Sequence, residues 1–580
     1  MKKIRACIVV ALALLSTTSL FSQINIGIHH YRMGDIQKAK KYLEKELANN
    51  PSDANFYLGE IAFSEGNMQL AEEFYKKGLS ANQENIRNQV GLIKLTLKTN
   101  IKEADNTLGA IVRKSNTTDA ALTVARAYAD NNMINKANDF IGRAKKINDK
   151  DPNIYILEGD IIVFESDAKK LGDAAAKYEM AIYFAPDYGL GYLKTADIYA
   201  RINPSLAIEN LKNIIEKQPE YIIAYSSLGK IYTQNGIYSQ AIEMFKNYFQ
   251  SGAYLIEDIE LYARSLYFTD NYAEAKKMVD EGLQINPSHF VLNRYLMYIY
   301  AKTKDIDNGS AFADKFFLLR EASGYIAQDY RMYAIILKNE KRHTESFINS
   351  EKAISIDPNM MESYTEAASA AREIKDYSRA SDYLKRQMVK RAELSENPEY
   401  EDNTIDINSL GYDYYSAGAT IEKNPSVAEE WMKNEKFINE LLSTNPELIA
   451  DSLKGNINYF TKNYATFFLN KADATFDILI QRVPESYLGY RFKALTKHAL
   501  NPDAEQGAAK EFYEKTVEII TGKESVSNSE TRVLLEAYNY LGYYYYLISD
   551  KPNTILYWNK VLEIDPENKN AKLVLDEMNK

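Results

Sequence analysis

The chain has 580 residues, of which 46% are hydrophobic and 26% are charged, and these proportions suit a folded soluble protein rather than a disordered one. The formal net charge is −10 and no long basic block interrupts the mixed signs, which excludes a protein built to neutralise nucleic-acid phosphates. With only 14 prolines and 25 glycines, the composition disfavours a turn-rich all-β fold and flexible linkers, and it favours helices.

The first 22 residues, MKKIRACIVVALALLSTTSLFS, have the pattern of a secretory signal peptide. Lys2, Lys3 and Arg5 form a positive start, and the apolar stretch that follows is too short for a membrane span. Ser22 is a small residue before the expected cut, but Leu20 departs from the usual small-residue pattern, so an uncleaved anchor is the alternative. In either case we expect an exported protein, periplasmic or outer-membrane associated, with no transmembrane span in the mature chain.

The sequence contains few groups that could perform chemistry. Cys7 is the single cysteine and lies inside the expected signal, so the mature chain would have no disulfide, cysteine nucleophile or thiolate metal site. The histidines lack the spacing of a metal site, and they are His29, His30, His289, His343 and His498. The stretches GLGYLK at 189–194 and TGKES at 521–525 each lack a glycine of the phosphate-binding loops they begin to match. We therefore predict no catalytic residue, no metal and no cofactor.

A proline recurs along the chain after amphipathic stretches, which indicates an internal repeat. The recurrences are Pro51, Pro186, Pro219, Pro287, Pro358 and Pro566. Pro186 and Pro219 are 33 residues apart, and the next unit reads YIIAYSSLGKIYTQNGIYSQAIEMFKNYFQSGA. Its landmarks are Tyr225, Leu228, Gly229, Tyr232, Ala241 and Phe245.

The tyrosine-rich stretch YNYLGYYYYLISD, residues 538–550, fits the same template. Its matching landmarks are Tyr538, Leu541, Gly542, Tyr545, Thr554, Trp558, Val561 and Pro566. These spacings resemble the tetratricopeptide repeat, a helical hairpin with a Leu-Gly pair, aromatic and small residues and a proline at fixed offsets. The resemblance implies an all-α, right-handed superhelical solenoid. Its concave face, built largely from the first helix (helix A) of each hairpin, would bind a protein or a peptide.

Physical reasons support the template. A glycine such as Gly229 or Gly542 would lie where helix A crosses the second helix (helix B), and its missing side chain would let the two backbones approach. Turn residues separate the two helices, and proline excludes helical geometry at the residue before it, ending helix B. The expected turns are MGD at 33–35, EGN at 65–67, QNG at 234–236 and TDN at 269–271.

The template extends over nearly the whole mature chain and predicts about fifteen hairpins. Two hairpins carry insertions, FESDAKKLGD at 164–173 and YSAGATIEKNPSVAEE at 415–430. The polar, acidic segment 391–408 has no helical period, so it divides the prediction into an N-terminal array at 23–390 and a C-terminal array at 409–580. The final residues, PENKNAKLVLDEMNK, predict a helix that caps the last hydrophobic face.

Charged residues of both signs recur on the expected A helices. They are Glu60, Arg126, Asp160, Asp197, Lys230 and Arg264. Such alternation is more typical of a solvated face, and the alternative is that these residues line the concave groove. In the tyrosine-rich helix, Tyr538 and Tyr545 occupy core positions, whereas Tyr543 and Tyr546 fall on the expected concave face and are further groove candidates.

The sequence thus predicts a non-catalytic scaffold of the cell envelope that binds a protein or peptide in a concave groove. One alternative is an envelope protein that binds carbohydrate through exposed groove tyrosines. Another is an enzyme with a site in the irregular region 391–530. The stretch DSL at 451–453 resembles the acceptor motif for O-linked glycans in periplasmic proteins of Bacteroidota, which would suit such a source.

Overall fold

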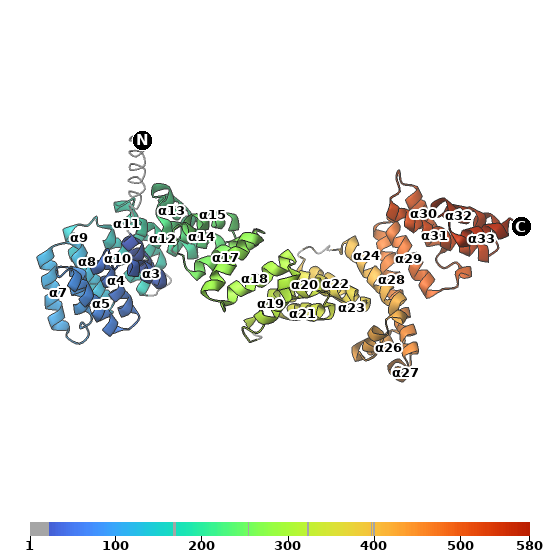
Figure 1. The fold of residues 1–580 in the computed structure, drawn as a ribbon, viewed down its shortest axis with the longest axis horizontal. Helices are drawn as coiled ribbons and strands as arrows, with labels where there is room; N and C mark the ends of the chain where they lie inside the picture. The colour runs from blue at the N-terminus through green and yellow to red at the C-terminus, as the bar shows by residue number, and fades with distance from the viewer. Residues whose placement is uncertain are drawn as a thin grey trace, which may run out of the picture. The chain divides into compact units, whose positions relative to one another are not determined.

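The computed structural model describes residues 23–165, 170–252, 254–321, 324–395, 397 and 401–579. The expected signal peptide and Cys7 lie outside these residues. Within them the chain forms helices and no strand, so the expected all-α fold is confirmed (Figure 1). None of the helices in the described ranges is long and apolar enough to cross a membrane. Contacts divide the chain into two compact units, Met1–Ile299 and Tyr300–Lys580.

In the first unit, successive helices pair as hairpins of helix A and helix B. The pairs are α2 (Gln23–Met33) with α3 (Ile36–Lys45), α4 (Pro51–Ser64) with α5 (Met68–Ala81), α6 (Ile86–Lys94) with α7 (Ile101–Ser115), α8 (Thr118–Ala129) with α9 (Ile134–Ile147), α10 (Pro152–Phe164) with α11 (Leu171–Phe184), α12 (Gly189–Ile202) with α13 (Pro204–Lys217), α14 (Ile222–Gln234) with α15 (Tyr238–Phe249), and α16 (Ile256–Phe268) with α17 (Tyr272–Ile285). Helix α18 (Phe290–Thr303) contains the boundary between the units.

The second unit continues the same construction. Its regular helices are α19 (Ile306–Phe316), α20 (Ala327–Asn339), α21 (His343–Ile356), α22 (Met361–Glu373), α23 (Tyr377–Leu394), α29 (Tyr487–Leu500), α30 (Lys510–Thr521), α31 (Asn528–Leu547), α32 (Lys551–Ile564) and α33 (Lys569–Met578), with a short 3-10 helix, η4 (Ala504–Gln506), between α29 and α30. The exception is α24 (Thr404–Thr420), which packs against the 26-residue α28 (Ile457–Arg482). Between them lie η3 (Ile421–Lys423), α25 (Pro425–Met432), α26 (Glu435–Thr444) and α27 (Ala450–Gly455).

This inserted group is larger than the predicted insertion at 415–430, whose first residues belong to α24. Figure 1 shows α26 and α27 at one end of α28, which both contact. The segment 391–408 contains helix at both ends, because α23 reaches Leu394 and α24 begins at Thr404. Its role as a boundary between two arrays stays a prediction.

The turns between helices A and B are where the sequence places them. Gly34, Gly66, Gly236 and Asp270 each have a positive φ, between 59° and 81°, which reverses the chain after helix A. The prolines also behave largely as expected, because five of the six recurrences follow the end of helix B by two residues. Pro51 differs, since it is the first residue of α4, a position where its missing N–H costs nothing.

The reason for the glycine of helix A differs from the one we expected. A Cβ at Gly229 would lie 3.0 Å from ring atoms of Phe245, and one at Gly542 would lie 3.0 Å from the indole of Trp558. In each hairpin the space over the glycine is thus filled by the aromatic ring of helix B rather than by its backbone. Tyr538 and Tyr545 are both buried, as expected for core positions, with 4% and 8% of their surfaces exposed.

Candidate binding cavity of the first unit

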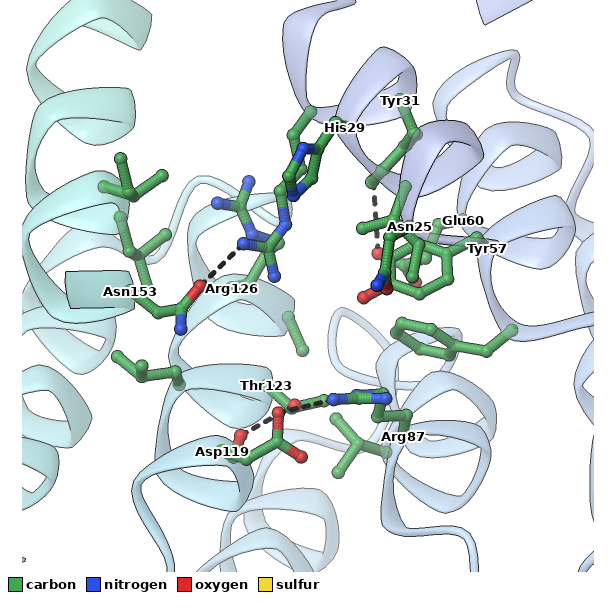
Figure 2. A pocket seen from close by; sticks show the side chains of 18 of the residues that line it. Asn25, His29, Tyr31, Tyr57, Glu60, Arg87, Asp119, Thr123, Arg126 and Asn153 are labelled. Atoms are coloured by element: carbon green, nitrogen blue, oxygen red, sulfur yellow. Dashed lines mark hydrogen bonds and ion pairs between the residues drawn. The ribbon is translucent and has the colours of Figure 1, made fainter. Parts of the chain in front are cut away.

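The A helices of the first six hairpins surround a cavity with a volume of about 400 Å³, which we call the A-helix cavity. Figure 2 shows side chains from these helices pointing into one space. Its polar lining residues include Asn25, His29, Tyr31, Arg32, Tyr57, Glu60, Arg87, Lys94, Asp119, Thr123, Arg126, Asp151, Asn153, Asp187 and Tyr188. A volume of this size lies within the range of ligand-binding pockets.

Equivalent positions of successive A helices carry paired charges. We call Glu60, Lys94, Arg126, Asp160 and Lys194 the charge ladder; each residue follows the one before by about one repeat. Lys94 Nζ lies 2.9 Å from Glu60 Oε2, and Arg126 Nη2 lies 2.7 Å from Asp160 Oδ2. Lys194 Nζ lies 2.9 Å from the other oxygen of Asp160. Ion pairs between repeats therefore hold neighbouring A helices in register.

Tyrosines of the B helices donate hydrogen bonds to the two acids of the charge ladder. Tyr75 donates a hydrogen bond of 2.6 Å to Glu60, and Tyr178 donates one of 3.0 Å to Asp160. Burial raises the pKa of the Tyr75 hydroxyl, and the neighbouring charge of Glu60 raises it further, so this hydroxyl stays a donor. Burial alone would raise the pKa of Asp160, but the charges of Lys194 and Arg126 outweigh burial and lower it to about 2.

Arg32 differs from the other cations of the cavity. Its Nη1 donates to Asn153 Oδ1 at 2.7 Å and to the Tyr188 hydroxyl at 3.2 Å, both of which are neutral acceptors. Among the described residues Arg32 forms no ion pair with a carboxylate, and Asp160 acts on it only through its charge. By contrast, Arg87 lies 2.8 Å from Asp119 and 3.2 Å from Asp53.

The first hairpin also contacts helices far along the sequence, and α2 packs against α12. His29 Nδ1 is hydrogen-bonded to the Tyr221 hydroxyl at 2.7 Å. Lys38 Nζ lies 2.7 Å from Asp258 Oδ1, and Lys41 donates to the Tyr254 carbonyl at 2.8 Å. We call these three contacts the seam. They join residues 192, 220 and 213 positions apart, so the hairpins of the first unit close into a ring around the cavity.

Burial also affects the protonation of His29 and the ion pair of Lys38 with Asp258 in the seam. It lowers the pKa of His29 to about 3, with smaller contributions from the charges of Arg32 and His30, so the ring is neutral at physiological pH. The ion pair of Lys38 and Asp258 is largely buried, with 13% and 4% of the two side chains exposed. Removing one partner of such a pair leaves the other as an uncompensated buried charge.

The eight predicted groove residues do not form one site. Glu60 and Arg126 line the cavity, and Asp160 is bonded to Arg126. The other three A-helix candidates lie on later helices: Asp197 forms an exposed pair with Arg201 at 3.7 Å, Lys230 is exposed on α14, and Arg264 lies over the Phe268 ring at 5.9 Å. Tyr543 and Tyr546 lie on α31 in the second unit; Tyr543 is 49% exposed, and Tyr546 donates to Glu577 at 3.1 Å.

Sequence reasoning missed Lys94, Lys194, Arg32 and Arg87. The two lysines had a detectable signal, because each lies 34 residues from an acidic residue that the sequence did single out. Arg32 had none, since its place depends on closure of the ring between distant hairpins. No group of three or more potential metal ligands occurs within the described part of the chain.

The family model, the curated relative and the three solved structures described here are all of tetratricopeptide repeat proteins. The family described as tetratricopeptide repeat matches residues 24–86. The TPR repeat-containing protein YpiA of Bacillus subtilis is 28% identical over 142 residues, which are 23% of this chain and 32% of that protein. The chain thus spans about a third of the length of this relative.

Solved structures of tetratricopeptide proteins are also similar. The C-terminal part of one from Cytophaga hutchinsonii is 20% identical, with 54% of this chain and 97% of that chain covered and a TM-score of 0.37. One from Parabacteroides merdae is 16% identical, with 44% and 98% covered and a TM-score of 0.29. YrrB, described as a TPR protein with an unusual peptide-binding site, is 16% identical, with 33% and 96% covered and a TM-score of 0.29. The chain thus resembles tetratricopeptide repeat proteins in its family match at residues 24–86 and in the repeated helical hairpins of its described residues.

Proposed function

We propose that this protein is a non-catalytic scaffold of the cell envelope that binds a peptide segment of a partner protein in the A-helix cavity. The tetratricopeptide fold supports protein–protein interaction in general. The observation that carries the proposal for this chain is the cavity itself, where six successive A helices bring charged, amide and aromatic side chains to one space. Such a lining offers hydrogen bonds to a peptide backbone and aromatic surface to its side chains.

A blocked cavity tests the proposal. Thr123 lines the cavity, and its hydroxyl bonds to the carbonyl of Asp119 one turn earlier. Thr123→Trp would fill the space with an indole. Thr107 makes the equivalent bond to Glu103 on the exposed surface of α7, so Thr107→Trp is the matched control. Tagged residues 23–580 of each form are used to capture partners from cross-linked envelope extract, which are identified by mass spectrometry.

We expect the wild type and Thr107→Trp to capture the same envelope protein in a stable ratio, and Thr123→Trp to lose it. Equal capture by both tryptophan variants would refute binding in the cavity. Recovery of polysaccharide without protein would instead favour the carbohydrate alternative, for which Tyr543→Ala and Tyr546→Ala would then be the informative variants.

The envelope location rests on residues 1–22 and is tested separately. We propose that cleavage after Ser22 releases a mature chain beginning at Gln23. Fractionation of cells followed by N-terminal sequencing of the protein checks this. An intact N-terminus in a membrane fraction would indicate the uncleaved anchor, and recovery from the cytoplasm would contradict export.

A further inference from the structure

The charges that line the A-helix cavity are nearly all matched within the protein. Lys94 pairs with Glu60, Arg126 pairs with Asp160, and Arg87 pairs with Asp119. Arg32 is the cation of this lining that bonds only to neutral acceptors among the described residues. An arginine side chain stays protonated in a protein, so its charge lies at the cavity wall without a carboxylate in ion-pair contact; Asp160 acts on it through its charge alone.

The other two acids of the lining, Asp151 and Asp187, do not form an ion pair with Arg32 either. Asp151 caps α10 by accepting from the Asn153 amide at 3.0 Å, and it also accepts from the Thr118 hydroxyl at 2.5 Å. Asp187 is exposed, and neither acid lies within ion-pair distance of Arg32. A guanidinium has five N–H donors in a planar fork, of which the two bonds made by Nη1 use only a part. Donors therefore remain for a planar or tetrahedral oxyanion.

Arg32 reaches the cavity because of the ring closure. It lies in the last turn of α2, and the residues it contacts, Asn153 and Tyr188, belong to the fifth and sixth hairpins. The seam holds α2 and α3 against that side of the ring through Lys38 and Lys41. If the first hairpin moved away from α12, α14 and α16, Arg32 would leave the cavity with it.

We propose that Arg32 binds an oxyanion of the ligand, a carboxylate or a phosphate, and that this site exists only when the first hairpin is docked along the seam. That a peptide carries this oxyanion depends on the proposed function, whereas the anion site at Arg32 does not depend on it. Ligand binding and ring closure are then coupled, because an anion that binds only the closed ring also stabilises it.

Isothermal titration of residues 23–580 with inorganic phosphate and with succinate tests the site. We expect the wild type to bind at least one of the two anions and Arg32→Gln to bind it at least tenfold more weakly, since one charge-assisted contact is lost. Arg143→Gln is the control, because Arg143 is exposed on α9 over the Phe140 ring and should leave binding unchanged. Arg32→Lys keeps the charge and should retain part of the affinity.

The coupling is tested with Lys38→Met, which breaks the seam without touching the cavity lining. We expect anion affinity to fall in proportion to the fraction of molecules whose first hairpin is undocked. Equal affinity of Lys38→Met and the wild type would refute the requirement for docking, and no anion binding by the wild type would refute the site. Arg32-dependent binding alongside unchanged partner capture by Thr123→Trp would leave this inference standing while refuting the proposed function.

Discussion

At the scale of single residues, Asp160 shows how this protein keeps charged groups inside a ring of helices. One oxygen accepts from Arg126 and the other from Lys194, while the Tyr178 hydroxyl adds a neutral donor. The carboxylate therefore satisfies two cations from two neighbouring repeats. Its two interactions outweigh the burial that would otherwise raise its pKa.

Asp160→Asn should destabilise the first unit in a pH-dependent manner. At neutral pH it leaves Arg126 and Lys194 facing each other without their shared carboxylate, a loss on the order of 3 kcal/mol. The pKa of Asp160 is about 2 when folded, below the value of about 3.9 for an unfolded aspartate. Its stabilising effect is thus complete above about pH 4 and is lost as the pH falls through about 2.

Urea unfolding of the wild type and of Asp160→Asn between pH 7 and pH 2 measures this effect. The difference in unfolding free energy should be constant near neutrality and should shrink by on the order of 2 kcal/mol below pH 4. Asp139→Asn, on an exposed position of α9, is the control and should change stability little. A difference that stays constant down to pH 2 would contradict the assigned role of Asp160.

At the scale of the hairpin, the contact between helix A and helix B depends on a glycine under an aromatic ring. A Cβ at Gly59 would lie 2.5 Å from Cε1 of Tyr75, and one at Gly159 would lie 2.4 Å from Cε1 of Tyr178. Neither ring is free to yield, because its hydroxyl is bonded to Glu60 or Asp160 on the same helix A. The glycine thus also positions the acid that follows it.

Gly59→Ala should therefore destabilise the protein by about 1–3 kcal/mol, through overpacking against Tyr75. Gly142→Ala is the matched control, since Gly142 lies within helix α9 and a Cβ there would meet no atom within 4 Å. This control should stabilise by about 0.5–1 kcal/mol, the ordinary gain of alanine over glycine in a helix. Thermal unfolding of both variants checks the opposite signs, and shifts in the same direction would disprove the packing argument.

Local patterns predict the hairpins well because the repeat places its contacts within one period. The turns at Gly34, Gly66 and Gly236 and the buried Tyr545 follow from the template alone. The partner of α24 does not follow from the template, since the chain forms α25 to α27 before it returns as α28.

Only part of the cavity lining could be predicted from the sequence. Glu60 and Arg126 stood out by sign and period, but the neighbours of Arg32 are set by contacts between hairpins far apart in sequence.

At the scale of the whole molecule, the closed ring of the first unit departs from a simple linear array. In a linear array each repeat contacts only its neighbours, so the terminal repeats unfold most readily. Here the first hairpin packs its apolar side on α4 and α5, through Ala39 and Leu43, and meets the later hairpins through the largely polar seam. Each end of the ring therefore stabilises the other.

Breaking the seam should return the first unit to linear behaviour. Lys38→Met leaves Asp258 buried without its lysine, so α2, α3 and α16 should exchange their amide hydrogens faster, while α8 and α9 at the far side of the ring change little. Lys40→Met is the control, because its pair with Glu65 is partly exposed and such pairs contribute about 0–1 kcal/mol. Hydrogen exchange followed by mass spectrometry resolves these helices separately. Faster exchange in α2 and α3 alone, with α16 unchanged, would contradict this prediction. It would mean that the later hairpins are stable without the seam and that the first hairpin does not close the ring.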